Sequence, residues 1–90
     1  MSCHSRTIEI TNRRGLHARA SAKFVNLASS LAAKVEVEKD GNRVVGTSIM
    51  GLMMLGAAMG DSITSHCVGD GCEEAIADLA ALVEGRFGEE

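Results

Sequence analysis

The chain contains no proline, tryptophan or tyrosine, and two phenylalanines make up its whole aromatic content of 2%. It therefore lacks the stacking side chains of a single-strand nucleic-acid surface. Its net charge of −3, with basic residues scattered along the chain, also excludes a basic stripe for phosphate backbones. No run approaches the roughly 20 apolar residues of a membrane span. We expect partners that are proteins or small anions, with no nucleic acid and no membrane insertion.

Cysteine is scarce, with three residues at positions 3, 67 and 72. An odd and small number does not fit the disulfide framework of a secreted domain. Residues 1–16 also carry polar groups where a signal peptide needs an apolar core. The sequence therefore predicts free thiols in a reducing cytoplasm. Pairing of two of the three under oxidation stays open.

Ninety residues, 46% hydrophobic and 23% charged, are typical of one globular domain, which we expect to span 1–90. Apolar residues alternate in 5–11, 34–39, 43–46 and 61–68, which predicts strands. Helical spacing appears in 18–31 and 72–84, and a short apolar segment occupies 48–55. Asp40 and Gly41 predict a hairpin turn. The order β-α-β-β-α-β-α favours one sheet with helices on one face.

The stripe predicted to be buried in the first helix consists of residues that recur every three or four positions: Ala20, Phe24, Leu27, Ala28 and Leu31. Ser21 lies largely off this stripe.

His17 lies where a loop meets this first helix, within the run GLHAR at 15–19. The first amides of a helix lack internal acceptors and favour a negative group, so a phosphorylated histidine suits this place. A neutral imidazole is a competent nucleophile, and Arg19 can offer forked donors to phosphoryl oxygens. The alternative is that His17 merely ends a loop and Arg19 is a solvated charge.

The segment 48–55 is the second unusual feature. Ser48 precedes an apolar run and is expected to be a helix N-cap. Two turns of helix cannot bury Ile49, Met50 and Met53 together with their apolar neighbours. Some of these side chains must then be exposed, and methionine suits an adaptable protein-binding surface. The alternative is a buried helix without a polar face.

Together, GLHAR at 15–19, AKFV at 22–25 and SIMGL at 48–52 make the chain similar to HPr, the phosphocarrier of the bacterial phosphoenolpyruvate-dependent phosphotransferase system. The resemblance covers essentially the whole chain. It implies an α+β fold, an open-faced β-sandwich in which a four-stranded antiparallel sheet carries three helices on one face. It also implies a cytoplasmic monomer without cofactor or metal, a carrier in a transferase relay rather than an independent enzyme.

The resemblance further implies roles for individual residues. His17 would accept a phosphoryl group from enzyme I and pass it to an enzyme IIA-type acceptor, assisted by Arg19. Ser48 would be the serine modified by an HPr kinase/phosphatase, where one is present. Ile49, Met50 and Met53 would match the apolar patch that docks partners. The sugar-transport and nitrogen-related branches are not separated.

The chain departs from the family at Ala20, where proline is usual after the arginine. Alanine is a good helix former, so we expect a modest change in stability and intact transfer chemistry.

Other functions are weaker candidates. Cys3-His4 and His66-Cys67 could meet at one sheet end as zinc ligands, but successive strand residues point to opposite faces, so no metal site is predicted. A purely regulatory module controlled at Ser48 would not need His17 and Arg19. A ligand-sensing domain has no use for the helix-end histidine, and a hydrolase lacks a carboxylate to orient it.

Overall fold

A computed structural model of the chain describes residues 3–88, so both ends of the predicted 1–90 domain lie outside the described residues. The elements follow the predicted order. They are β1 (Cys3–Glu9), α1 (Ala18–Ser29), β2 (Lys34–Lys39), β3 (Asn42–Val45), α2 (Ile49–Met54), β4 (Ser62–Val68), α3 (Cys72–Glu84) and a final 3-10 turn, η1 (Arg86–Gly88). None of the helices within 3–88 is long and apolar enough to cross a membrane.

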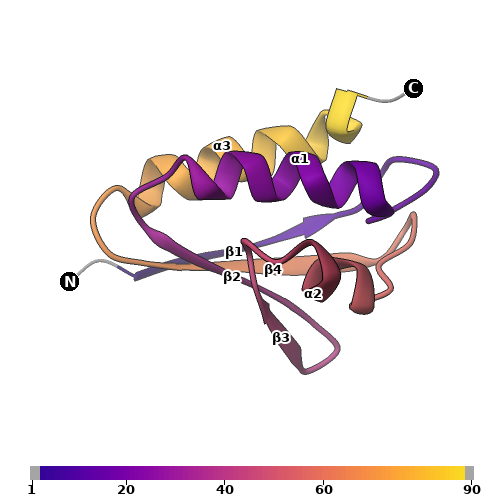
Figure 1. The fold of residues 1–90 in the computed structure, drawn as a ribbon, viewed down its shortest axis with the longest axis horizontal. Helices are drawn as coiled ribbons and strands as arrows, with labels where there is room; N and C mark the ends of the chain where they lie inside the picture. Colours follow the sequence, from indigo (N-terminus) through magenta and orange to yellow (C-terminus); the bar gives the residue numbers. More distant parts are fainter. Residues whose placement is uncertain (1–2, 89–90) are drawn as a thin grey trace.

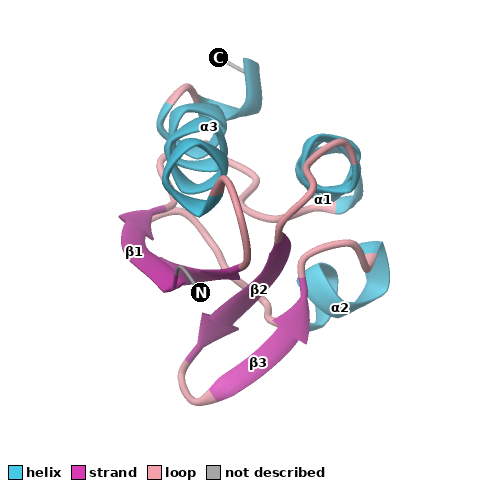
Figure 2. Cartoon of the chain, turned by 90° about the vertical axis from the view of Figure 1, so that its left-hand side faces the viewer, coloured by secondary structure: helices cyan, strands magenta, loops and turns pink. Residues whose placement is uncertain are grey.

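The four strands form one antiparallel sheet in the order β1-β4-β2-β3. Figure 1 shows α1 and α3 running along the sheet, and the end-on view of Figure 2 places α2 beside α1 at the β3 edge. The predicted open-faced α+β fold is confirmed.

The helices cover the apolar face of the sheet, where Val37 and Ile63 are fully buried together with Phe24 of α1 and Leu79 of α3. The opposite face is polar because side chains alternate along each strand. There Thr7 and Thr64 share a hydrogen bond of 2.9 Å across β1 and β4, and His66 Nε2 lies 2.8 Å from Glu38 Oε1 across β4 and β2.

Element boundaries differ from prediction where hydrogen bonds override hydrophobic period. The first helix ends at Ser29, not at 31, because Ser30 caps it: the Ser30 backbone N–H and hydroxyl both donate to the carbonyl of Leu27. The first strand is displaced to Cys3–Glu9 because it pairs with β4 as far as Val68. The predicted hairpin turn is confirmed, with Asp40 at φ 52° and Gly41 at φ 83°.

Candidate functional site

His17 is the N-cap of α1, as predicted. Its backbone is extended (φ −73°, ψ 179°), and its partly exposed imidazole folds back over the helix start. The backbone N–H of Arg19 donates to Nδ1 of His17 at 3.2 Å. Nδ1 is therefore the ring nitrogen with the lone pair, and it faces the positive end of the α1 dipole.

The loop between β1 and α1, here called the histidine loop, is held against the segment that follows α2. The N–H of Leu16 donates to the carbonyl of Ala57 at 2.9 Å. Gly15 allows this approach: at φ 62°, a Cβ there would lie 2.3 Å from the Ala57 oxygen and 2.8 Å from Cα of Ala58. Only glycine fits both the backbone conformation and the space.

Asp61 fixes the turn that carries Ala57. Its carboxylate accepts the N–H of Ala58 at 2.9 Å, and Lys39 lies 3.8 Å from the same oxygen. The pKa of Lys39 is raised, mainly by its hydrogen bond to Asp40, and the nearby charge of Asp61 adds to the effect. The hairpin turn thus supports the turn beneath the histidine loop.

Two polar side chains behind the histidine loop were missed by the sequence analysis. Asn12 and Ser21 are completely buried. Asn12 Nδ2 donates to the carbonyl of Gly15 at 2.8 Å, and the Ser21 hydroxyl donates to that of Leu16 at 3.2 Å. The placement of Ser21 off the buried stripe is wrong, since the loop folds back over the first turn of α1 and covers it. The only sequence signal was their position on either side of His17.

Arg19 occupies the second position of α1 and is exposed to solvent. Its backbone already points to the His17 ring through the N–H bond described above. Its side chain starts within one turn of the imidazole, a distance that a guanidinium can span. Ala20, the next residue, is fully buried against the core.

Ser48 is the N-cap of α2, as predicted. Its hydroxyl oxygen accepts the N–H of Gly51 at 3.0 Å, and its carbonyl accepts the N–H of Leu52 at 3.0 Å. A Cβ at Gly51 would lie 3.1 Å from both Ser48 Oγ and Val44 Cβ, so the small residue keeps the cap closely packed.

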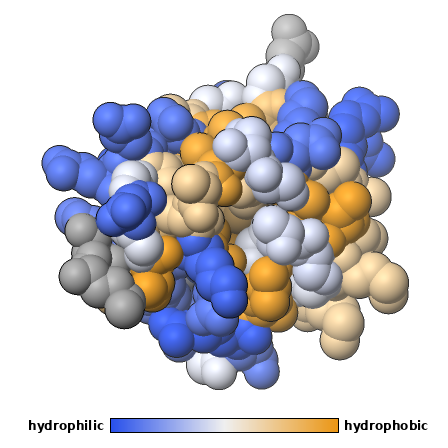
Figure 3. Space-filling model, turned by 60° about the vertical axis from the view of Figure 1, so that its left-hand side comes forward, coloured by the Kyte–Doolittle hydropathy of each residue, from blue (hydrophilic) through white to orange (hydrophobic). Residues whose placement is uncertain are grey.

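Four α2 side chains form an apolar surface, here called the α2 patch: Ile49, Met50, Met53 and Met54. Their exposed fractions are 40%, 74%, 44% and 80%. Leu52 alone within α2 is buried and anchors the helix to the core. Figure 3 shows apolar side chains gathered on the side of the molecule where α2 lies. The alternative of a buried helix is therefore wrong. Met54 belongs to this surface although the sequence analysis did not single it out.

The possible metal ligands at the β1 and β4 ends are divided between the two faces of the sheet. His4 lies opposite Cys67, whereas Cys3 lies opposite Val68. The part of the chain covered by residues 3–88 contains no group of three residues that could hold a metal ion. The division between the faces follows from the alternation of side chains along each strand.

The expectation of three free thiols needs correction. Cys67 at the end of β4 and Cys72 at the start of α3 form a disulfide with a Cα–Cα distance of 5.5 Å, and Cys3 is the free, exposed thiol. The turn 69–71 reverses the chain and brings the two buried cysteines into the range that a disulfide spans. The pairing left open for oxidising conditions is the one present.

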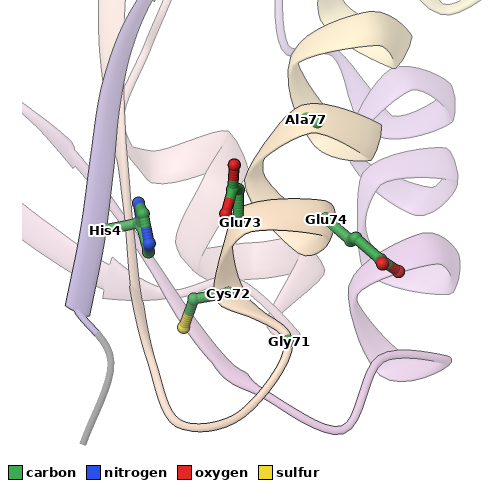
Figure 4. A pocket seen from close by; sticks show the side chains of 6 residues that line it. All are labelled: His4, Gly71, Cys72, Glu73, Glu74 and Ala77. Atoms are coloured by element: carbon green, nitrogen blue, oxygen red, sulfur yellow. The ribbon is translucent and has the colours of Figure 1, made fainter.

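A hollow beside this disulfide is lined by residues from β1 and the start of α3. Figure 4 shows His4 on one wall, with Cys72, Glu73 and Glu74 on the other. The two glutamates lie in the first turn of α3, where they complement its positive end. They also give the hollow the wrong charge for an anion, so this helix start does not resemble that of α1.

Comparison with known proteins places the chain among phosphocarriers. The family model described as "PTS HPr component phosphorylation site" matches residues 4–85. The chain is 51% identical to phosphocarrier protein HPr of Neisseria meningitidis, over 92% of this chain and 93% of that protein. It is 44% identical to HPr of Cupriavidus necator, over 93% and 94%. A crystal structure of HPr from Thermoanaerobacter tengcongensis superimposes with a TM-score of 0.92 at 47% identity, covering 97% and 98% of the two chains.

Proposed function

Because the chain belongs to the HPr family of phosphocarrier proteins, we propose that it carries a phosphoryl group on His17 between enzyme I and an enzyme IIA-type acceptor. The observation that carries this assignment is the hydrogen bond from the Arg19 N–H to Nδ1 of His17. It places the lone pair of a neutral imidazole at the start of a helix, where a negative group is stabilised.

The transfer requires one bond to form and one to break. The Nδ1 lone pair of His17 attacks phosphorus on the phosphorylated donor, and the bond between phosphorus and the donor breaks, returning its electron pair to the donor. The 3.2 Å hydrogen bond to the Arg19 N–H is long, so the ring gives it up at low cost. A phosphoryl oxygen then accepts that N–H in place of Nδ1, and the Arg19 guanidinium can pair with a second oxygen. Passing the group to the acceptor reverses these steps.

The α2 patch is the proposed docking surface. Enzyme I and the acceptor must each bring a reacting group to His17, so both need an anchor beside it. Ile49, Met50 and Met53 offer exposed apolar area on a helix that packs against α1. Flexible methionines can adapt to two different partners. We infer that the protein does this as a cytoplasmic monomer.

Ser48 is the proposed regulatory site for an HPr kinase/phosphatase. Its hydroxyl caps α2 at the edge of the α2 patch. A phosphoserine there would add about −1.5 to −2 charges at neutral pH, which a helix start tolerates and an apolar interface does not.

The test is phosphorylation from phosphoenolpyruvate and enzyme I, with the acid-labile product detected by phosphorus NMR. We expect His17→Ala to accept no phosphoryl group. His4→Ala and His66→Ala are matched controls on the strands, and both should be phosphorylated at the parent rate. Label on the His17 variant, or its absence from the parent protein, would refute the assignment.

A further inference from the structure

Two buried polar side chains converge on the backbone immediately before His17. Asn12 and Ser21 are fully buried, and each donates a hydrogen bond to one carbonyl of the loop, at Gly15 and Leu16 respectively. Placing an amide and a hydroxyl in a core costs free energy that an apolar side chain of similar size avoids. A specific task at these two positions explains their use.

That task is visible in how completely the loop backbone is held. The N–H of Gly15 donates to the carbonyl of Asn12, and the N–H of Leu16 donates to that of Ala57. Together with the two side-chain bonds, these bonds give every backbone N–H and C=O of Gly15 and Leu16 a hydrogen-bond partner. The carbonyl of His17 then accepts the N–H of Ser21 as the first bond of α1. Ser21 thus holds the backbone on both sides of the His17 Cα, through the carbonyls of Leu16 and His17.

We propose that Asn12 and Ser21 are positioning residues for phosphoryl transfer at His17. By fixing the two peptide units before the histidine, they hold its Cα and the direction of its side chain, so that Nδ1 stays over the Arg19 N–H. Neither side chain touches the phosphoryl group. This inference rests on the proposed function of His17 and concerns the rate of the chemical step, because the α2 patch that binds partners is not altered.

The experiment compares Ser21→Ala, which removes a single hydroxyl, with Asn12→Asp, which keeps the shape but replaces the amide donor. Three quantities are measured on each purified protein. They are the exchange rate of the Arg19 amide proton by NMR, the melting temperature, and kcat and KM for phosphorylation by enzyme I. Ser30→Ala removes the equivalent hydroxyl-to-carbonyl bond at the other end of α1. Ala80→Gly in the core of α3 supplies a general loss of stability.

We expect faster exchange at Arg19 and a kcat lowered about tenfold with KM unchanged for both variants, because small misplacements of a reacting atom already slow transfer. Ser30→Ala and Ala80→Gly should leave the exchange rate and kcat at the parent values, even where Ala80→Gly lowers the melting temperature as much. If Asn12→Asp does not fold, Ser21→Ala decides alone. If the parent protein is phosphorylated but Ser21→Ala behaves like Ala80→Gly, the positioning role is refuted and the proposed function stands. A parent protein that takes no phosphoryl group overturns the function instead.

Discussion

Replacing Gly15 by alanine tests whether the contact between the histidine loop and Ala57 shapes the site. The new Cβ would lie 2.3 Å from the Ala57 oxygen, about 1 Å inside an ordinary contact, and the three atoms nearest to it are all backbone. The loop must therefore move away from Ala57, which lengthens or breaks the 2.9 Å bond from the Leu16 N–H. Gly56 provides a matched control, because its φ of 65° is nearly that of Gly15 at 62° and nothing lies within 4 Å of its Cβ position.

Both substitutions place alanine at a positive φ, but only Gly15→Ala also forces its Cβ into occupied space. A non-glycine residue at positive φ costs roughly 1–2 kcal/mol, partly offset by the roughly 0.4–1 kcal/mol that alanine contributes through the unfolded chain. Gly56→Ala should then lose about 1 kcal/mol. Forcing atoms into occupied space adds about 1–3 kcal/mol, so Gly15→Ala should lose about 2–4 kcal/mol. At about 4–8 °C per kcal/mol for a domain of this size, the melting temperature falls by about 4–8 °C in the first case and by at least about 8 °C, and up to about 30 °C, in the second.

Both variants should remain folded at 25 °C, because a 90-residue domain has a stability of about 5–13 kcal/mol. Melting by circular dichroism gives the stability difference, and phosphorylation by enzyme I at 25 °C gives the functional one. We expect Gly56→Ala to be phosphorylated like the parent and Gly15→Ala more slowly. Equal melting temperatures for the two variants would refute the steric argument. A normal rate in a destabilised Gly15→Ala protein would show that the tie to Ala57 matters for folding alone.

Three further predictions concern the proposed roles of exposed residues. Arg19→Ala should melt within a few degrees of the parent, because an exposed residue adds little to the core. It should exchange its phosphoryl group several-fold more slowly in a stopped-flow assay, because charge-assisted bonds to phosphate are strong. Unchanged kinetics would leave the backbone amides as the only contacts to the phosphoryl group. Met50→Glu should raise KM for enzyme I at unchanged melting temperature, while Met59→Glu, at another exposed methionine that lies outside α2, should not. Equal effects would remove the α2 patch as the anchor. Ser48→Asp should keep or raise the melting temperature, since a carboxylate still caps α2, and should slow phosphorylation of His17. A strongly destabilised Ser48→Asp protein would contradict the cap argument, and undiminished transfer would contradict the switch.

Local signals in the sequence predicted much of this fold because they coincide with the local bonds that form it. The bounds of β2 and α3 match their hydrophobic periods, and Ser48 caps α2 because its oxygen needs only an amide three residues away. The position of His17 at a helix start follows from the same kind of local reading. For both caps, the hydrogen-bond partner lies within three residues of the capping side chain.

The features that could not be predicted depend on contacts between distant parts of the chain. Ser21 belongs to the polar set by helical period, yet the loop that covers it is drawn back by Ala57, some forty positions further along. The pairing of Cys67 with Cys72 is a different case: the two residues are only five positions apart, and their approach depends on how the turn 69–71 reverses the chain between β4 and α3. Hydrophobic period and composition predict neither the approach of Ala57 to the histidine loop nor the chain reversal at 69–71.

The hydrogen bond from Leu16 to Ala57 also bears on how the proposed carrier would serve two partners. A carrier needs a docking surface that adapts and a reacting atom that does not move. Met50 and Met54 are largely exposed, and methionine side chains can adapt to different partners. By contrast, every backbone N–H and C=O of Gly15 and Leu16 has a hydrogen-bond partner. Because α2 leads within three residues to Ala57, a partner bound to the α2 patch as proposed would contact a helix that is joined directly to the segment holding the loop before His17. Under the proposed function, adaptability of the α2 patch would leave the position of Nδ1 unchanged, and the same geometry would receive the phosphoryl group from one protein and offer it to another.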